Sequence, residues 1–305
     1  MNRIPLIIDA DPGIDDAVAL MMAFEAKNLD IKLITCTAGN NTLENITANT
    51  LGILDLIGAP EIRVAAGARK PLKRDAFIKL LAQGENGMGG FKFPASSRKV
   101  DSAPAWDAMA DVIKTSPTPV TICALGPLTN IAHLINTHPD VLAKIDKIVM
   151  MAGSLYEDGR TAAPYAEFNI ACDPEAGEVV LNSGARLVCV PMEMGHKGFL
   201  NWEEVFKTRE MNMVGDTLEN IFRNYCDRHV QNGIAMHDGT AIAYLIDPTI
   251  FVEEAAEIKV VYLKEIATGI FQIDLSKNAK NSVLTEINVK KFKKTYFNAL
   301  KHCKK

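Results

Sequence analysis

Short apolar runs alternate with amphipathic helical segments through the first two thirds of the chain, and this alternation restricts the possible folds most strongly. Strands are expected at residues 4–8, 31–37, 64–65, 120–125, 147–151 and 187–191. Helices are expected at residues 16–27, 42–57, 106–115, 129–136 and 175–181. Uninterrupted apolar strands that alternate with helices are typical of parallel sheets buried on both faces. The sequence therefore predicts an α/β fold, with an open, mostly parallel central sheet and helices on both faces.

The last third of the chain follows a different pattern. A polar helical stretch at 202–231 precedes an expected helix at 239–245. Two strands are expected at 258–263 and 269–273, and a basic helix from Val289 ends the chain. The sequence contains no repeat, low-complexity tract or clear linker, so residues 1–305 are predicted to form a single domain.

The composition excludes several classes of partner. With 48% hydrophobic residues the chain can bury a large core, and its net charge of −4 disfavours binding to nucleic acid, which needs a basic face. No uncharged apolar run reaches the about 18 residues of a membrane span. Asp9 and Asp11 interrupt the first apolar run before it is long enough for a signal peptide, so we expect a cytoplasmic protein. The six scattered cysteines lack zinc-site spacing and are expected to be buried.

Four aspartates lie within eight residues, where the first strand gives way to the first helix. They are Asp9, Asp11, Asp15 and Asp16. Pro12 suits the first helical position with Asp11 as the cap, which would place Asp15 and Asp16 in the first turn. One or two acids would suffice for capping, and two carboxylates about 4 Å apart repel by roughly 4 kcal/mol at an effective dielectric of 20. A cation would relieve this repulsion, and ligation by oxygen alone favours Ca²⁺ or Mg²⁺.

Other polar groups follow strand ends or precede helices later in the chain. They occur in the segments A-G-N-N at 38–41, L-G-P-L-T-N at 125–130, A-E-F-N at 166–169 and M-H-D-G at 236–239. Each segment alone also fits a turn, a cap or a hydrogen-bonded core histidine. Because ligand sites in open α/β sheets lie at the carboxyl ends of strands, we expect these groups to meet at one sheet edge.

The longest irregular stretch covers residues 67–104. Gly84, Gly87, Gly89 and Gly90 lie near its centre and predict a mobile, functional loop. The chain has neither a G-x-x-x-x-G-K-[ST] phosphate loop nor a G-x-G-x-x-G motif between strand and helix. These absences make a nucleotide-phosphate site a weak interpretation.

Residues 9–17 read D-x-D-P-G-x-D-D-A, which resembles the signature of the inosine-uridine-preferring nucleoside hydrolases. The A-G-N, L-G-P-L-T-N, A-E-F-N and H-D segments resemble further motifs of that family in the same order, so the resemblance spans nearly the whole chain. It implies a Rossmann-like core, one Ca²⁺ ion, and cleavage of ribonucleosides into base and ribose. It also implies a homodimer or homotetramer.

The resemblance assigns roles residue by residue. The calcium ligands would be Asp11, Asp16, Asp238 and the backbone carbonyl of Leu125. The ribose would contact Asp15, Asn40, Met151, Glu167 and Asn169. Asp11 would be the general base, while His237 would lie near the leaving base and protonate it.

These residue types suit glycoside cleavage, which passes through a cationic, oxocarbenium-like sugar. Acidic walls stabilise that charge. Calcium would orient a water and lower its pKa, and Asp11 would take the proton. An ion that also binds the 2′- and 3′-hydroxyls predicts a preference for ribosides over 2′-deoxyribosides.

The sequence departs from the family at several positions. Gln83 replaces a histidine that contacts base or sugar, and Thr161 replaces an asparagine that binds the 5′-hydroxyl. Residues 191–196 replace L-D-V-T of the relatives, and no role is assigned to Glu193 or His196. Tyr225 fits a base-stacking residue and a core aromatic equally well.

Two alternatives remain. A calcium-loaded protein that binds a nucleoside or ribose without turnover would be compatible with Gln83 and Thr161. A haloacid-dehalogenase-type phosphatase would use Asp9 as nucleophile and Asp11 as acid/base. The phosphatase usually has Thr or Val where Gly13 stands, and it leaves the A-E-F-N and H-D segments unexplained.

Overall fold

A computed structural model describes residues 3–75, 83–155, 167–223, 232–263 and 268–303. In this part of the chain a nine-stranded sheet has the order β10-β9-β11-β6-β5-β4-β1-β2-β3. Its strands are β1 (Ile4–Ala10), β2 (Leu29–Cys36), β3 (Arg63–Ala66), β4 (Val120–Ala124), β5 (Ile145–Met151), β6 (Leu187–Val190), β9 (Phe251–Leu263), β10 (Thr268–Leu275) and β11 (Ser282–Ile287). All neighbouring strands between β3 and β11 in this order are parallel to each other. Strand β9 is antiparallel to both of its neighbours, β11 and β10. The predicted fold class is confirmed.

The order of the central strands creates the edge on which the polar segments meet. In this register Asp9 of β1 lies between Thr35 of β2 and Ala124 of β4. The backbone N–H of Leu125 donates to the Asp9 carbonyl at 2.7 Å. The segments that follow β1, β2 and β4 therefore leave the sheet side by side, as the sequence predicted.

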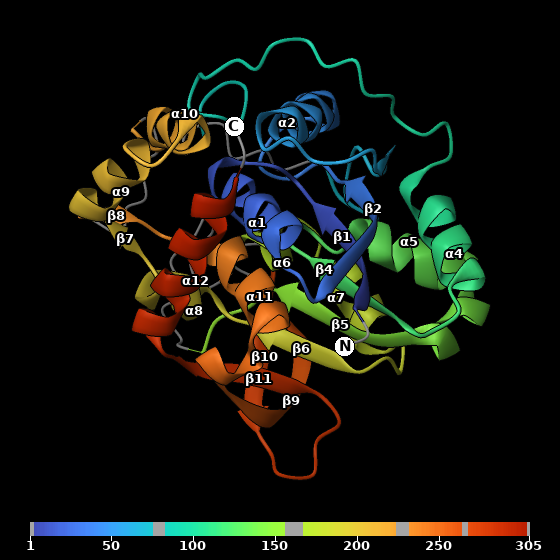
Figure 1. The fold of residues 1–305 in the computed structure, drawn as a ribbon. Coiled ribbons are helices and arrows are strands. Elements are labelled where there is room, and N and C mark those ends of the chain that lie inside the picture. The colour runs from blue at the N-terminus through green and yellow to red at the C-terminus, as the bar shows by residue number, and fades with distance from the viewer. Residues whose placement is uncertain (1–2, 76–82, 156–166, 224–231, 264–267, 304–305) are drawn as a thin grey trace.

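Helices cover both faces of the sheet. Figure 1 shows α1 (Ile14–Glu25), α11 (His237–Ile246) and α12 (Val289–His302) in front of it, with α2 (Leu43–Leu56) beside them. The opposite face carries α4 (Ala105–Thr115), α5 (Thr129–Thr137) and α7 (Pro174–Leu181), which contribute buried residues to a second hydrophobic core. In β1, the side chains of Leu6 and Ile8 pack into the hydrophobic core under α1, α2, α11 and α12, and that of Ile7 packs into the core under α4, α5 and α7. This alternation shows that the central strand is buried on both faces.

The start of α1 differs from the prediction. The helix begins at Ile14 with Gly13 as its N-cap, so placing Pro12 first in the helix with Asp11 as cap was wrong. Asp16, at the third helical position, accepts the Gly13 N–H at 2.9 Å and supplies the capping contact. The carboxylate of Asp11 is thereby left for other contacts.

The predicted helical stretch at 202–231 is broken. It forms α9 (Trp202–Arg209) and α10 (Met213–Phe222). The first of these ends at Arg209, with Glu210 as its C-cap. Asn212 is the N-cap of α10, because its side chain accepts the Gly215 N–H at 2.9 Å. Residues 224–231, which include Tyr225 and Cys226, lie outside the described residues.

Several elements were not predicted, and most of them contain too few residues to display a period. These are α6 (Phe168–Cys172), α8 (Met192–Lys197), β7 (Leu200–Asn201), β8 (Gly233–Ile234), η1 (Pro139–Lys144), η2 (Pro248–Ile250) and the sheet strand β11. The helix expected at residues 175–181 forms as α7, and Asp173 caps it, because its side chain accepts the Ala176 N–H at 3.0 Å.

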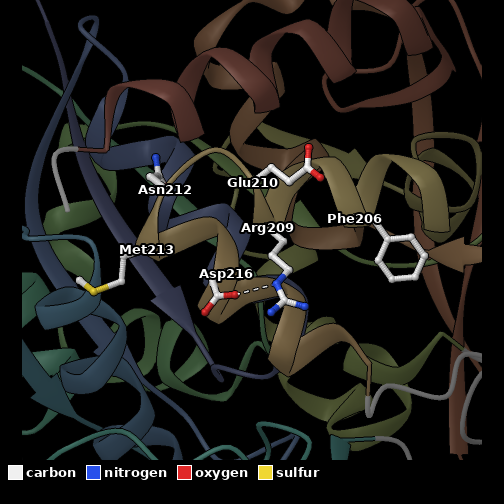
Figure 2. Close-up of a pocket in the computed structure, with 6 residues that line it drawn as sticks. All are labelled: Phe206, Arg209, Glu210, Asn212, Met213 and Asp216. Atoms are coloured by element: carbon white, nitrogen blue, oxygen red, sulfur yellow. Dashed lines mark ion pairs between the residues drawn. The ribbon is translucent and has the colours of Figure 1, made fainter.

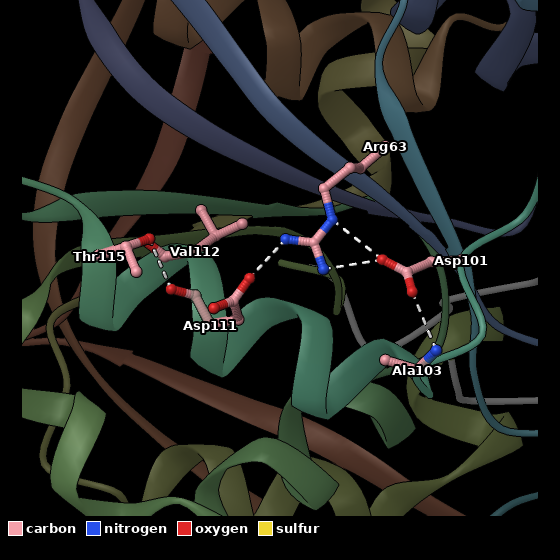
Figure 3. A network of polar contacts seen from close by, with 6 residues as sticks. All are labelled: Arg63, Asp101, Ala103, Asp111, Val112 and Thr115. Atoms are coloured by element: carbon pink, nitrogen blue, oxygen red, sulfur yellow. Dashed lines mark hydrogen bonds and ion pairs between the residues drawn. The ribbon is translucent and has the colours of Figure 1, made fainter.

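The long 67–104 segment returns to the strand from which it departs. The Asp101 N–H donates to the Val64 carbonyl at 2.7 Å, and Asp101 forms a parallel bridge with Ala65. Figure 3 shows the Arg63 guanidinium between Asp101 and Asp111, at 2.7 and 2.6 Å. The two ends of the 67–104 segment are thus held together beside β3 and α4.

No helix among the described residues is long and apolar enough to cross a membrane. The five cysteines in the described ranges, namely Cys36, Cys123, Cys172, Cys189 and Cys303, are buried, as expected.

Candidate active site

Three carboxylates converge at the carboxyl edge of the sheet. Asp15 and Asp16 lie in the first turn of α1, and Asp238 lies in the first turn of α11. Each contributes an oxygen within 4.8 Å of the other two, and all three side chains are buried. Because α1 packs against α11, the two helix starts bring together acids from opposite ends of the chain.

Asp11 lies beside this group and is held by the segment that follows β2. Its carboxylate accepts the Asn40 N–H at 2.7 Å, and the Asn40 side chain donates to the Asp11 carbonyl at 3.2 Å. A Cβ at Gly39 would lie 2.2 Å from Asp11 Oδ2, and one at Gly126 would lie 2.7 Å from Oδ1. The two motif glycines therefore provide the space that this carboxylate occupies.

The cluster gathers buried carboxylates at one place in the described part of the chain. Burial, with the charge of Asp15, raises the pKa of Asp16 to about 7. Burial raises the pKa of Asp238 and of Asp11 well above their usual range, and neighbouring aspartates add to both shifts. No ion pair between described residues involves these acids, and Asp16 Oδ1 is buried without a hydrogen-bond partner there. The cluster can therefore bind a metal ion, and its oxygen donors suit a hard divalent cation.

Asn169 joins two strand ends at the site. Its Nδ2 donates to the Leu125 carbonyl at 2.7 Å and to the Met151 carbonyl at 2.9 Å, and it lies 3.4 Å from the Met151 sulfur. The structure thus brings together three of the residues that the sequence predicted for the site. The Leu125 carbonyl, expected as a metal ligand, here accepts a hydrogen bond from Asn169.

Glu167 lies next to Asn169 and caps α6. Its carboxylate accepts backbone N–H groups from Asn169 (2.7 Å), Ile170 (3.2 Å) and Gly153 (3.2 Å). Burial nevertheless raises the pKa of Glu167 to about 7, and the nearby His237 opposes that shift. His237 therefore lies close enough to Glu167 for its charge to act on that carboxylate.

His237 is the first residue of α11 and is half-buried. Its ring lies edge-on to the ring of His196 on α8, with centroids 5.0 Å apart and an interplanar angle of 74°. No role for His196 was expected from the sequence, because the two histidines are distant in the chain. Only the packing of α8 against α11 reveals the pair.

Gln83, which the sequence predicted to contact the substrate, lies at the start of α1. Its side chain is buried, and its Oε1 accepts the Ile14 N–H at the start of α1 at 3.0 Å. The following glycine-rich residues are also held, because Asn49 donates to the Asn86 carbonyl at 2.8 Å and Asn41 to the Glu85 carbonyl at 3.1 Å. The centre of the 67–104 segment is therefore docked beside the acids. Thr161, like Tyr225, lies outside the described residues.

Asp9 supports the site from within the sheet. It accepts Thr35 Oγ1 at 2.6 Å and Asn130 Nδ2 at 2.8 Å, and burial raises its pKa to about 7. Asn130 also bonds the Cys36 carbonyl at 3.0 Å and the Ala68 N–H at 2.8 Å. Asn130 is the last residue of the L-G-P-L-T-N segment, so the sequence had already marked this segment as part of the site.

A separate surface hollow lies between α9 and α10. Figure 2 shows Arg209 paired with Asp216 at 3.0 Å, between Phe206 and Met213. None of the residues predicted for the site lines this hollow, so the polar segments identify the aspartate cluster as the candidate site.

Fold and site together define an α/β enzyme with a buried acidic cluster, able to bind metal, at the carboxyl edge of its sheet. The family model described as "Inosine-uridine preferring nucleoside hydrolase" matches residues 6–294. The chain belongs to this family and is an enzyme of the nucleoside hydrolase class.

Individual relatives agree with this assignment. The chain is 38% identical over 294 residues to the non-specific ribonucleoside hydrolase RihC of Escherichia coli O17:K52:H18, covering 95% of this chain and 96% of the relative. The solved plant nucleoside hydrolase PpNRh1 superposes with a TM-score of 0.91 at 25% identity, covering 98% of this chain and 99% of the other. A purine-preferring ribonucleoside hydrolase from Gardnerella vaginalis gives 0.89 at 27% identity, with 97% and 98% covered.

Proposed function

We propose that this protein catalyses calcium-dependent hydrolysis of the N-glycosidic bond of ribonucleosides, releasing free base and ribose. The observation that carries the proposal is the convergence of buried carboxylates from α1 and α11 within 4.8 Å of one another. Such a cluster can bind a divalent cation and can stabilise the positive charge that develops on the sugar. The non-specific ribonucleoside hydrolase among the relatives supports a broad choice of base.

Asp11, Asp16, Asp238 and the Leu125 carbonyl would hold the calcium ion. A calcium ion held there would lower the pKa of a coordinated water and favour substrates that carry both ribose hydroxyls. The Asp11 carboxylate, fixed by the Asn40 N–H, removes the proton from the attacking water. Because the Leu125 carbonyl already accepts the Asn169 amide, Asn169 would keep that carbonyl oriented toward the site.

The sugar would lie between the carboxylates and the strand ends. Asp15, Asn40, Glu167 and Asn169 would contact its hydroxyls, with Met151 packed against the ring. As the C1′–N bond lengthens, positive charge develops on the sugar, and the ionised forms of these acids stabilise it. The preference would be for ribosides, since 2′-deoxyribosides lack one of the recognised hydroxyls.

The leaving base would face His237, which lies at the start of α11 near Glu167. A hydrogen bond from the His237 imidazole to the base nitrogen would ease departure of an otherwise poor anion. The side-chain oxygen of Gln83 accepts the Ile14 N–H and so caps the start of α1. Its amide nitrogen would donate a hydrogen bond to the substrate.

The two alternatives are less well supported. Family membership favours turnover over a binding-only protein. A phosphatase would need Asp9 as an accessible nucleophile, but this side chain is fully buried in the sheet and bonded to Thr35 and Asn130.

We further propose one domain for residues 1–305, supported by the single sheet that contains strands from both ends of the chain. A homodimer or homotetramer is also part of this proposal and rests on the family.

The test is release of reducing sugar from a panel of ribonucleosides, with calcium and after exhaustive chelation. We expect sugar with calcium, little or none without it, and less from 2′-deoxyribosides. Calcium binding without release of sugar from any nucleoside would favour the binding-only protein. Undiminished release after chelation would refute the metal dependence.

A further inference from the structure

Helix α8 lies where the sequence departs from its relatives, and it contacts the site at two points. At its start, the Met192 N–H donates to the Gly153 carbonyl at 3.1 Å. Glu193, which is buried, accepts the Ser154 hydroxyl at 2.5 Å and the Leu155 N–H at 3.1 Å. These bonds fix the turn after β5, from which Gly153 also donates to Glu167.

The other end of α8 adjoins His237. A Cβ at Gly195 would lie 2.2 Å from His237 Nδ1 and 2.7 Å from its Cα, so only glycine leaves room for the imidazole here. The Gly195 carbonyl accepts the Met236 N–H at 3.4 Å, which ties α8 to the start of α11. The adjacent His196 ring stands edge-on to the His237 ring at 5.0 Å. Glycine backbone and histidine ring thus bound the imidazole on two sides.

We propose that His196 is a positioning residue, whose ring holds the His237 imidazole in the orientation required to hydrogen-bond the departing base. This inference rests on the proposed function, in which His237 faces that base. Edge-to-face contact is directional, so it restricts the ring plane as well as filling space. His196 would act only through His237.

The orientation of a donor matters most when the leaving group needs it. A purine base departs with the electron pair of the C1′–N bond and is a poor anion, so it gains from a hydrogen bond at its nitrogen. Nitrophenolate departs unaided. Losing the orientation of His237 should therefore affect the two substrates differently, whereas general damage to the site would slow both.

The variants His196→Ala and His196→Phe separate the ring contact from other properties of histidine. Lys197→Ala, at an exposed position on the same helix, is the matched control. Steady-state kinetics are measured with inosine and with nitrophenyl riboside, and crystal structures of all variants report the His237 rotamer. We expect His196→Ala to lower kcat on inosine by roughly three- to tenfold, the range given by one aromatic contact, with KM nearly unchanged.

Nitrophenyl riboside cleavage by His196→Ala should stay close to wild type, and His196→Phe should restore most of the inosine activity. In crystals, His237 should leave its wild-type rotamer in the alanine variant alone. An unchanged His237 ring in His196→Ala, or equal losses on both substrates, would overturn the inference. If the wild-type protein hydrolyses no nucleoside, the proposed function fails, while the His237 rotamer still decides whether His196 positions it.

Discussion

The buried carboxylates predict that Asp16→Asn stabilises the metal-free protein and abolishes its stabilisation by calcium. Asp16 has an oxygen within 4.8 Å of oxygens on both Asp15 and Asp238. Two unit charges about 5 Å apart repel by roughly 3 kcal/mol at an effective dielectric of 20, and the substitution removes the repulsion between Asp16 and Asp15. The amide oxygen of the new side chain can still accept the Gly13 N–H, so the start of α1 keeps its cap.

The same residue gives this prediction a pH dependence. Burial, with the charge of Asp15, raises the Asp16 pKa from 3.8 to about 7. The folded metal-free protein therefore retains a proton that the unfolded chain has lost, and its free energy of unfolding falls as pH rises from about 4 to about 7. A shift of about three pH units corresponds to at most about 4 kcal/mol. Calcium needs ionised ligands, so its stabilising effect should grow across the same range.

The melting temperature is measured by calorimetry at pH 5 and at pH 8. Each protein is measured after chelation and then across a calcium titration. Calcium at about 100 times its Kd stabilises the folded state by roughly 2.7 kcal/mol, which corresponds to about 4 °C for a chain of this length. Wild type should show this shift at pH 8 and a smaller one at pH 5. The metal-free Asp16→Asn variant should melt above metal-free wild type at pH 8 and respond little to calcium.

Asp274→Asn is the matched control, since it removes an exposed carboxylate far along the chain from the cluster. It should show the full calcium shift. If Asp16→Asn responds to calcium like wild type, Asp16 is not a ligand. If its metal-free form melts below metal-free wild type at pH 8, the argument from charge repulsion is wrong.

Three further substitutions test the roles at the site. Asp11→Ala should lower kcat at least about 100-fold without changing the circular dichroism spectrum, and near-normal turnover would remove it from the mechanism. His237→Ala should slow inosine cleavage more than nitrophenyl riboside cleavage, and equal losses would indicate a structural role. Gly39→Ala would place a Cβ 2.2 Å from Asp11 Oδ2, so the carboxylate must move, and we expect about a 100-fold loss of kcat. Full activity of Gly39→Ala would show that the base tolerates displacement.

The sheet and its functional edge were predictable because buried parallel strands have uninterrupted apolar runs. The expected strands at 4–8, 31–37 and 120–125 match β1, β2 and β4 within three residues at each end. Once those strands are adjacent, their polar ends must meet, and the convergence of Asp11, Asn40 and the Leu125 carbonyl follows from the α/β topology.

Features that depend on long-range contacts were not predictable. The bond between Gln83 and the Ile14 N–H joins residues 69 positions apart, so its sequence neighbours gave no indication that Gln83 caps α1. The N-cap of α1 was missed for a local reason, because Asp16 accepts the Gly13 N–H in place of the capping role expected of Asp11. Helix α8 is only six residues long, so its pairing of His196 with His237 became visible only in three dimensions.

Three glycines at the site are needed because they leave room for neighbouring side chains, and not because of their backbone conformation. None of Gly39, Gly126 and Gly195 adopts a positive φ, so an L-residue could adopt their backbone conformation. A Cβ at the first two positions would collide with the Asp11 carboxylate, and one at Gly195 would collide with the His237 imidazole. The general base and the leaving-group donor of the proposed mechanism are therefore both seated directly against backbone. A larger residue at any of the three positions would therefore displace a side chain on which the proposed mechanism depends.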